Sequence, residues 1–352
     1  MVDIAIIDKN FAVPRRVQRT DIVYYDIEQE PFRIYGIHKE NGKFRRMPQE
    51  EAQKVSQHIV NLHICTAGGR VRFVTDSPYI AIHAELNHVE SMPHMTLCGS
   101  AGFDLYTREN GKEYFQGTFR PTYDANHCYE SLIELTERKE RMYTVNFPLY
   151  SGVSKLYIGL QRDATLKRAE DYTYEKPIVS YGSSTTQGGC ATRPGNSYQS
   201  ILGRWLDCNY INLGFSGNAK GEDEMVDYLC GLAMHAFIMD YDYNAPTPEH
   251  LRYTHEKMYL AIRKVQPMLP IIMLTRPKYY VTPWDKEFLE VIRTTYKHAI
   301  ENGDKNIYLI EGTELMKEVK DDGTVDGVHP TDAGFFSIAR AIAPMLKKIL
   351  ET

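Results

Sequence analysis

The first half of the chain alternates short hydrophobic runs with turn residues. Asn41-Gly42 and Asn110-Gly111 each stand between two extended runs, which is typical of tight β-hairpins. A turn at residues 76–78 separates two further strands, and only residues 47–60 have the spacing of a helix. Many short strands with turns at short intervals predict an antiparallel β-sandwich or jelly roll.

After about residue 175 the hydrophobic pattern changes, and short apolar runs alternate with long amphipathic segments. The apolar runs predict strands at residues 177–182, 209–217, 236–242, 269–276 and 306–312. The amphipathic segments predict helices at residues 197–207, 222–232, 248–265, 285–302 and 332–351. This alternation of strand and helix predicts an α/β domain with a parallel sheet covered by helices on both faces.

The change in pattern also divides the chain. Residues 161–177 form a charged stretch without clear periodicity, and a chain of 352 residues is long enough for two domains. We therefore predict a β-sandwich domain over residues 1–172 and an α/β domain over residues 173–352.

Composition narrows the classes of partner. The chain is 43% hydrophobic and 25% charged with a net charge of −5, and it has no run rich in Lys and Arg. Nucleic acid and anionic membranes are therefore not expected partners. The N-terminus lacks the basic and apolar regions of a secretory leader, and the six cysteines are widely spaced, so we expect free thiols and a cytoplasmic protein. Homo-oligomerisation stays open.

Polar residues follow the predicted strands of the second half, at the sheet edge where such folds bind ligands. The first four strands are followed by Ser183-Ser184-Thr185, Ser216-Gly217-Asn218, Asp242-Tyr243-Asn244 and Arg276-Pro277-Lys278.

A second group stands before the last helix, where Asp326 and His329 lie three residues apart. At this spacing the carboxylate can hold one imidazole nitrogen and leave the other to accept a proton. A serine nucleophile needs such a base. Taken alone, the pair is more typical of a helix cap or a polar contact on the surface than of a catalytic pair.

Together, the order and spacing of these motifs over residues 176–350 resemble the SGNH (GDSL-type) hydrolase family. The resemblance implies a flavodoxin-like catalytic domain behind the β-sandwich and a reaction without a cofactor. It implies that Ser184 is the nucleophile, His329 the general base and Asp326 the acid that orients it. It also implies an oxyanion hole formed by the backbone N–H groups of Ser184 and Gly217 and the side-chain amide of Asn244.

The chain departs from the family pattern at two places. Ser183 stands where the family has Asp before the nucleophile, and residues 241–245 replace the usual Gly-x-Asn-Asp. Ser216 is a rival nucleophile because residues 214–216 read Gly-x-Ser, which is the start of a nucleophile elbow. A nucleophile elbow needs Gly two residues later, however, and Asn218 stands there.

No metal site is predicted. His83, His88 and His94 lie near one another in the sequence, but strand alternation explains the first and no compact ligand set is visible. Cys190 lies near the proposed site as a pocket-lining thiol without a basic neighbour to activate it.

Acidic and aromatic residues after the third and fourth strands favour a sugar over a fatty chain. We predict that Asp242, Arg276, Tyr279 and Trp284 contact substrate. The predicted function is hydrolysis of O-acetyl or other short acyl groups on carbohydrates, with a small-molecule or oligosaccharide ester as partner, as in the two-domain carbohydrate esterases of the family. The alternatives are an acyltransferase, a thioesterase or lipase-like acyl hydrolase with a non-carbohydrate substrate, and a non-enzymatic carbohydrate-binding protein.

Overall fold

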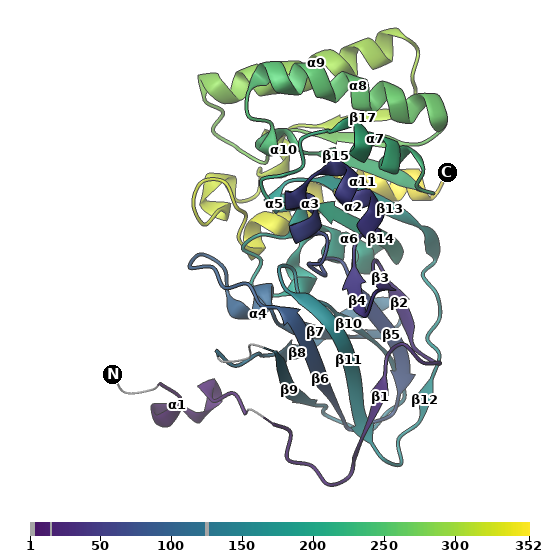
Figure 1. Ribbon diagram of the computed structural model, residues 1–352, viewed down its shortest axis with the longest axis vertical. Coiled ribbons are helices and arrows are strands. Elements are labelled where there is room, and N and C mark those ends of the chain that lie inside the picture. Colours follow the sequence, from purple (N-terminus) through teal and green to yellow (C-terminus); the bar gives the residue numbers. More distant parts are fainter. Residues whose placement is uncertain (1–3, 15, 124–126) are drawn as a thin grey trace.

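The computed structural model describes residues 4–14, 16–123 and 127–352. Its two domains are stacked along the long axis of the molecule, with the β-rich first domain below the α/β second domain in Figure 1.

The first domain is a sandwich of antiparallel sheets, as predicted. Phe73 and Val145 from one sheet meet Ile82 and Ile158 from the other in a common core. One sheet has the order β1 (Ile22–Asp26), β11 (Gly152–Gln161), β6 (Tyr79–His88), β9 (Cys128–Glu134). The other has the order β12 (Leu166–Lys167), β5 (Arg70–Thr75), β10 (Arg141–Asn146), β7 (Phe103–Glu109), β8 (Lys112–Phe119), with β2 (Arg33–Tyr35) also paired to β5; β3 (His38–Glu40) and β4 (Lys43–Arg45) form a separate hairpin.

Both predicted hairpins are present. Asn41 and Gly42 connect β3 to β4, and Asn110 and Gly111 connect β7 to β8, with positive φ at all four residues. The turn at residues 76–78 has a different role, because β5 and β6 belong to different sheets. There the chain crosses the sandwich instead of forming a hairpin.

The predicted helix at residues 47–60 is two helices, α2 (Gln49–Val55) and α3 (Gln57–Leu62). Ser56 separates them, since its backbone is extended and its side chain accepts a hydrogen bond from the Ile59 N–H at 3.2 Å. The other short helices here are α1 (Ile4–Ile7), η1 (Lys9–Phe11) and α4 (Leu97–Ser100).

The second domain has a parallel sheet with the order β14-β13-β15-β16-β17, which is the flavodoxin-like order 2-1-3-4-5. Its strands are β13 (Tyr174–Gly182), β14 (Cys208–Gly214), β15 (Ala236–Asp240), β16 (Ile271–Leu274) and β17 (Ile307–Ile310). Its helices are α5 (Ser184–Gln187), η2 (Pro194–Asn196), α6 (Tyr198–Leu206), α7 (Asp223–Cys230), η3 (Asp242–Asn244), α8 (Pro248–Val265), α9 (Pro283–Glu301), α10 (Gly312–Leu315), η4 (Lys320–Gly323) and α11 (Asp332–Leu350).

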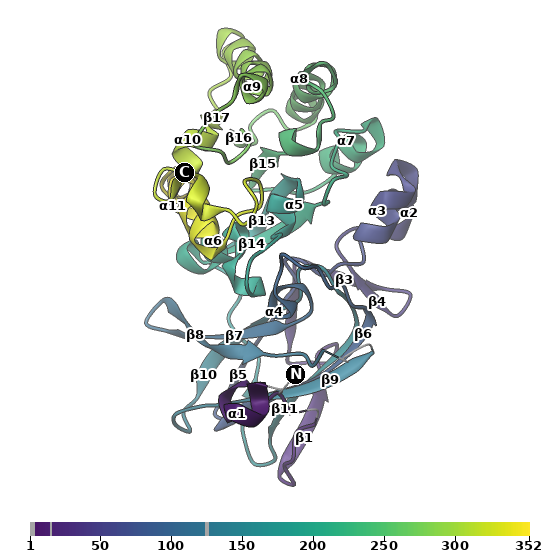
Figure 2. The ribbon, with the colours of Figure 1, turned by 90° about the vertical axis from the view of Figure 1, so that its left-hand side faces the viewer.

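Helices cover both faces of this sheet, which confirms the predicted fold class. α7, α8 and α9 bury Met225, Leu251 and Phe288 on one face, whereas α6 and α11 bury Ile201 and Ile338 on the other (Figure 2). No helix within the described ranges has both the length and the apolar character needed to cross a membrane.

The two domains share buried residues. Met47, Ala52 and Ile59 of the first domain belong to the same hydrophobic cluster as the α7–α9 face of the sheet. Arg70 is also buried at this junction. It donates to the Tyr210 carbonyl at 3.2 Å, and its guanidinium carbon lies 3.7 Å from the centre of the Tyr210 ring. The connecting segment, residues 168–173, therefore joins domains that are packed against each other.

Candidate active site

Ser184 begins α5, directly after the central strand β13. The strand order reverses at β13, because β14 and β15 pair with opposite edges of it, and ligands bind at such reversals. A Cβ atom on Gly182 would lie 2.1 Å from both the Asp240 carbonyl oxygen and Thr186 Oγ1. Only glycine allows this tight turn. The turn holds Ser184 at the end of the strand, where 8% of its surface is exposed.

The structure brings the three sequence-predicted groups together in one hydrogen-bonded chain. Ser184 Oγ lies 2.9 Å from His329 Nε2, and His329 Nδ1 lies 2.7 Å from Asp326 Oδ2. Asp326 Oδ1 also accepts the backbone N–H groups of Val328 and His329, at 3.0 and 2.8 Å. Partial burial opposes ionisation of Asp326, but these hydrogen bonds outweigh it and lower the carboxyl pKa to about 2.

The two other predicted oxyanion donors lie on neighbouring loops. Gly217 follows β14, has φ +69°, and faces open space on the side where a Cβ would be. Asn244 lies at the end of η3, and its Nδ2 donates to the Phe215 carbonyl at 2.9 Å. An amide nitrogen carries two N–H groups, so Asn244 holds the Gly217 loop with one and keeps a second donor.

Asp240 lies at the end of β15, behind the turn that carries Ser184. It is buried, and its Oδ2 accepts the hydroxyl of Thr186 at 2.7 Å, while its backbone carbonyl accepts the Ser183 N–H at 3.1 Å. Burial raises the carboxyl pKa of Asp240 to about 8, partly offset by the Thr186 hydrogen bond. At neutral pH this residue is therefore a neutral acid that supports the turn.

Two of the four predicted substrate contacts belong to the framework of the site instead. Asp242 and Arg276 are 1% and 9% exposed and are joined by an ion pair of 3.1 Å, and Arg276 also pairs with Asp285 at 3.1 Å. The space beside them is only about 10 Å³, too small for a substrate group. Tyr279 is half-buried and Trp284 is 52% exposed at the start of α9, so their contact with substrate stays a prediction.

Gln187 is a positioning residue that sequence reasoning missed. Its Oε1 accepts the Ser216 N–H at 3.1 Å, and its Nε2 donates to the Leu149 carbonyl at 3.2 Å. One buried side chain thus connects the helix of Ser184, the loop of Gly217 and the first domain.

Arg46 was also missed, and it supports the same loop from the first domain. It is buried, donates to the Gly214 carbonyl at the end of β14 and to the Leu62 carbonyl at 2.7 Å, and lies over the Phe215 ring at 4.7 Å. Burial lowers the pKa of Arg46 to about 10, so the side chain remains charged at neutral pH.

A cleft of about 550 Å³ opens beside the Gly217 loop, between the two domains. The second domain contributes Ser216 and Asn218. The first domain contributes His58, Asn61, Leu62, Ile64, Cys65, His88, Glu90, Met92 and Tyr150. The wall opposite the loop therefore comes from the first domain.

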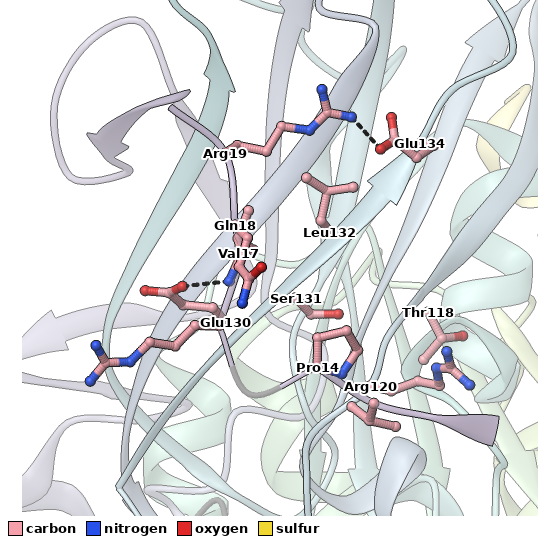
Figure 3. Close-up of a pocket in the computed structure, with 12 residues that line it drawn as sticks. Pro14, Val17, Gln18, Arg19, Thr118, Arg120, Glu130, Ser131, Leu132 and Glu134 are labelled. Carbon is pink, nitrogen blue, oxygen red and sulfur yellow. Dashed lines mark hydrogen bonds and ion pairs between the residues drawn. The ribbon is translucent and has the colours of Figure 1, made fainter. Parts of the chain in front are cut away.

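A larger cavity, of about 790 Å³, lies elsewhere. Figure 3 shows it between residues 13–14 and 16–19 on one side and the sandwich strands β8 and β9 on the other, where Arg19 pairs with Glu134 and the Val17 N–H donates to Glu130 at 2.9 Å. Its walls belong to the first domain, so it does not contribute to the chemistry at Ser184.

A flavodoxin-like sheet with a Ser–His–Asp chain at its reversal point, preceded by a β-sandwich, is the architecture of an SGNH-type hydrolase. The chain belongs to this family. Residues 175–347 match the GDSL-like lipase/acylhydrolase family, and residues 22–166 match the N-terminus of SGNH-hydrolase-type esterases.

Solved structures resemble the whole chain. A protein described as a GDSL-like lipase from Bacteroides ovatus is 28% identical with a TM-score of 0.84, and the match covers 94% of this chain and 98% of that one. A family two carbohydrate esterase from Cellvibrio japonicus is 13% identical with a TM-score of 0.60, at the same coverage of both chains. The salicylyl-acyltransferase of a tetracycline biosynthetic pathway is 16% identical with a TM-score of 0.75, again at 94% and 98% coverage. The comparison with curated proteins gave no match.

Proposed function

We propose that the protein is a serine esterase that removes O-acetyl or other short acyl groups from carbohydrates. The observation that carries the proposal is the hydrogen-bonded chain from Ser184 through His329 to Asp326, with distances of 2.9 and 2.7 Å. Such a chain gives a serine hydroxyl the base that it needs to attack an ester carbonyl.

In the proposed reaction, Ser184 Oγ attacks the acyl carbon while His329 Nε2 accepts the hydroxyl proton. The ionised carboxylate of Asp326 stabilises the imidazolium that forms. The carbonyl oxygen becomes negatively charged and is met by the N–H groups of Ser184, Gly217 and Asn244. His329 then protonates the departing sugar oxygen, and water attacks the acyl-enzyme by the reverse sequence.

The carbohydrate part of the proposal is supported by the character of the surroundings. The cleft beside the Gly217 loop is lined by polar groups such as His58, Asn61 and Glu90. Proteins with the same fold include an acetyl xylan esterase from the rumen bacterium Butyrivibrio proteoclasticus and a family two carbohydrate esterase from Clostridium thermocellum in complex with cellohexaose, each 13% identical with a TM-score of 0.60.

The second candidate is acyl transfer to an alcohol. It shares every step up to the acyl-enzyme and differs only in the group that attacks it. The salicylyl-acyltransferase with the same fold supports this alternative.

The test is acetate release from p-nitrophenyl acetate and from acetylated xylo-oligosaccharides. The wild type should release acetate from both, and Ser184→Ala should lower kcat by roughly 10⁴-fold or more without loss of fold. Ser216→Ala should keep most of the activity. Loss of activity in Ser216→Ala but not in Ser184→Ala would show that Ser216 is the nucleophile. If the wild type released no acetate, the proposed esterase function would be wrong.

The same assay distinguishes hydrolysis from transfer. With an unacetylated oligosaccharide present, a hydrolase should produce mainly acetate, whereas a transferase should produce mainly the newly acetylated sugar, detected by mass spectrometry.

A further inference from the structure

Three side chains from separate segments meet beside the nucleophile. His94, Cys190 and His329 each present one ligand atom, and these atoms all lie within 4.8 Å of one another. His94 belongs to the first domain and Cys190 to the loop after α5, while the His94 ring centre is 5.5 Å from that of His329. In the sequence His94 lies near His83 and His88 and far from Cys190 and His329. The cluster of His94, Cys190 and His329 is therefore visible only in the folded structure.

We propose that His94, Cys190 and His329 form a reversible binding site for a soft divalent cation such as Zn²⁺, which inhibits the reaction by occupying His329 Nε2. The binding site rests on geometry alone, whereas the inhibition rests on the proposed function of His329 as the base.

The donor set fits zinc. One cysteine sulfur and two imidazole nitrogens are among the ligands that Zn²⁺ prefers, and thiolate selects against the hard cations Mg²⁺ and Ca²⁺. Three protein ligands also leave a position for water. His94 is exposed, so its side chain can move closer as a cation binds.

Asp326 prepares His329 for this role. Histidines that bind metals usually donate their other ring N–H to a carboxylate or carbonyl, which fixes the ring and directs the free nitrogen to the metal. Asp326 occupies His329 Nδ1 at 2.7 Å, so Nε2 is the nitrogen that remains. The contact that orients a base toward a serine orients a ligand toward a cation equally well.

The backbone holds the Cys190 thiol in place. Cys190 has φ +72°, an unusual value for a residue other than glycine, and it follows Gly189, whose N–H donates to the Ser184 carbonyl at 2.8 Å. A bound cation would replace the proton of this thiol.

Binding and catalysis compete for one atom. His329 Nε2 lies 2.9 Å from Ser184 Oγ and would accept its proton. A nitrogen whose lone pair is bound to a cation cannot accept a proton, so an occupied site is inactive.

The test of binding uses Co²⁺, which gives a thiolate charge-transfer absorption band when a cysteine ligates it. We expect this band in the wild type and in the inactive Ser184→Ala variant, and its loss in Cys190→Ser. His94→Ala should raise the Kd for Co²⁺ at least tenfold. His298→Ala and Cys230→Ser, whose residues lie far from the cluster, are the controls and should bind as the wild type does. A missing band, or one that persists in Cys190→Ser, would overturn the site whether or not the protein is an esterase.

The test of inhibition is a Zn²⁺ titration of esterase activity followed by a chelator. Activity should fall with Zn²⁺ and return with the chelator, and the half-inhibiting concentration should rise at least tenfold in His94→Ala and Cys190→Ser, each relative to its own activity without Zn²⁺. Equal sensitivity in these variants would overturn the inhibitory role. An absence of esterase activity without Zn²⁺ would instead contradict the proposed function.

Discussion

Asp326 uses both carboxylate oxygens to fix His329. One accepts the imidazole N–H, and the other accepts two backbone N–H groups of the same loop. The residue therefore sets the position of the loop and the orientation of the ring together. Because these contacts lower its pKa to about 2, Asp326 stays ionised throughout the pH range in which enzymes usually work.

Asp326→Asn tests this arrangement. An amide of the same shape can keep the backbone contacts, but its NH₂ group cannot accept the imidazole N–H, so we expect kcat to fall roughly 10²–10⁴-fold with little change in KM. Steady-state kinetics on p-nitrophenyl acetate measure this. Asp322→Asn, on an exposed acid nearby in the chain, is the control, and an equal loss in both variants would contradict the role of Asp326.

Asn244→Ala tests the third oxyanion donor. The amide should meet a charge that exists only in the transition state, so its loss should lower kcat by about 10²–10³-fold and leave KM nearly unchanged. Kinetics on the same ester provide the measurement. An unchanged kcat here, together with a fall in Asn218→Ala, would move the donor to Asn218.

Sequence motifs predict the positions of residues whose spacing is set by chemistry better than they predict the directions of other side chains. Ser184, His329 and Asp326 come together as expected, because the end of a strand and a three-residue spacing determine their positions. Asp242 and Arg276 were placed at the correct edge of the sheet, but sequence does not tell which way a side chain points there. Gln187 was missed because its two partners are 29 and 38 residues away in the chain.

At the scale of elements, the turn between β13 and α5 rests on a buried neutral acid. Burial raises the folded-state pKa of Asp240 to about 8, whereas an unfolded chain loses this proton near pH 4. The folded state therefore holds the extra proton between these values. Stability from this group is fully present below about pH 4 and declines as pH rises toward 8, by up to about 1.4 kcal/mol per pH unit.

Asp240→Asn should remove this decline, since an amide stays neutral at every pH. We expect the free energy of unfolding of the wild type to fall relative to the variant by roughly 1–3 kcal/mol between pH 5 and pH 7. Urea unfolding at both pH values measures the difference, with Asp322→Asn as the control. A difference between wild type and Asp240→Asn that does not change with pH would show that Asp240 is ionised in the fold.

Elements with long, regular patterns were the most predictable. The helix predicted at residues 248–265 has those bounds, including the proline at its first position. The break at Ser56 was not predicted, because the hydrophobic spacing continues across it while a single side-chain cap divides the helix. The sheet membership of β5 and β6 was also hidden, since turn residues specify a change of direction but not the sheet that receives the next strand.

At the scale of the whole molecule, the shared core makes the domains interdependent. Expressing residues 175–352 alone would remove Met47, Ala52 and Ile59 from their cluster, along with Arg46 beneath the Gly217 loop. We expect this fragment to be poorly soluble or to have lost most of its esterase activity. A soluble, fully active fragment would contradict this prediction.

A milder variant tests the same coupling in the full chain. Ile59→Ala should lower the free energy of unfolding by roughly 2–4 kcal/mol, as is common for buried aliphatic residues. Trp205 and Trp284 lie in the second domain, so their fluorescence should report the loss even though the substitution is in the first domain. An unchanged fluorescence transition would show that the domains unfold independently.

This coupling also marks the limit of prediction at this scale. The sandwich and the α/β sheet follow from local patterns, and the charged stretch between them is the basis for the predicted division. The contact of α2 and α3 with the second domain does not follow from local patterns, because the residues that they contact begin more than a hundred residues further along the chain.

The shared cluster has a consequence for biosynthesis. The segment that carries Ala52 and Ile59 leaves the ribosome well before α7, the helix of the second domain that contacts α2. Making the intervening chain takes roughly eight to thirty-five seconds at ordinary rates of translation. During that interval the apolar face of α2 and α3 lacks its partner in the second domain, so we expect a chaperone at the exit tunnel or fast translation to protect the nascent chain.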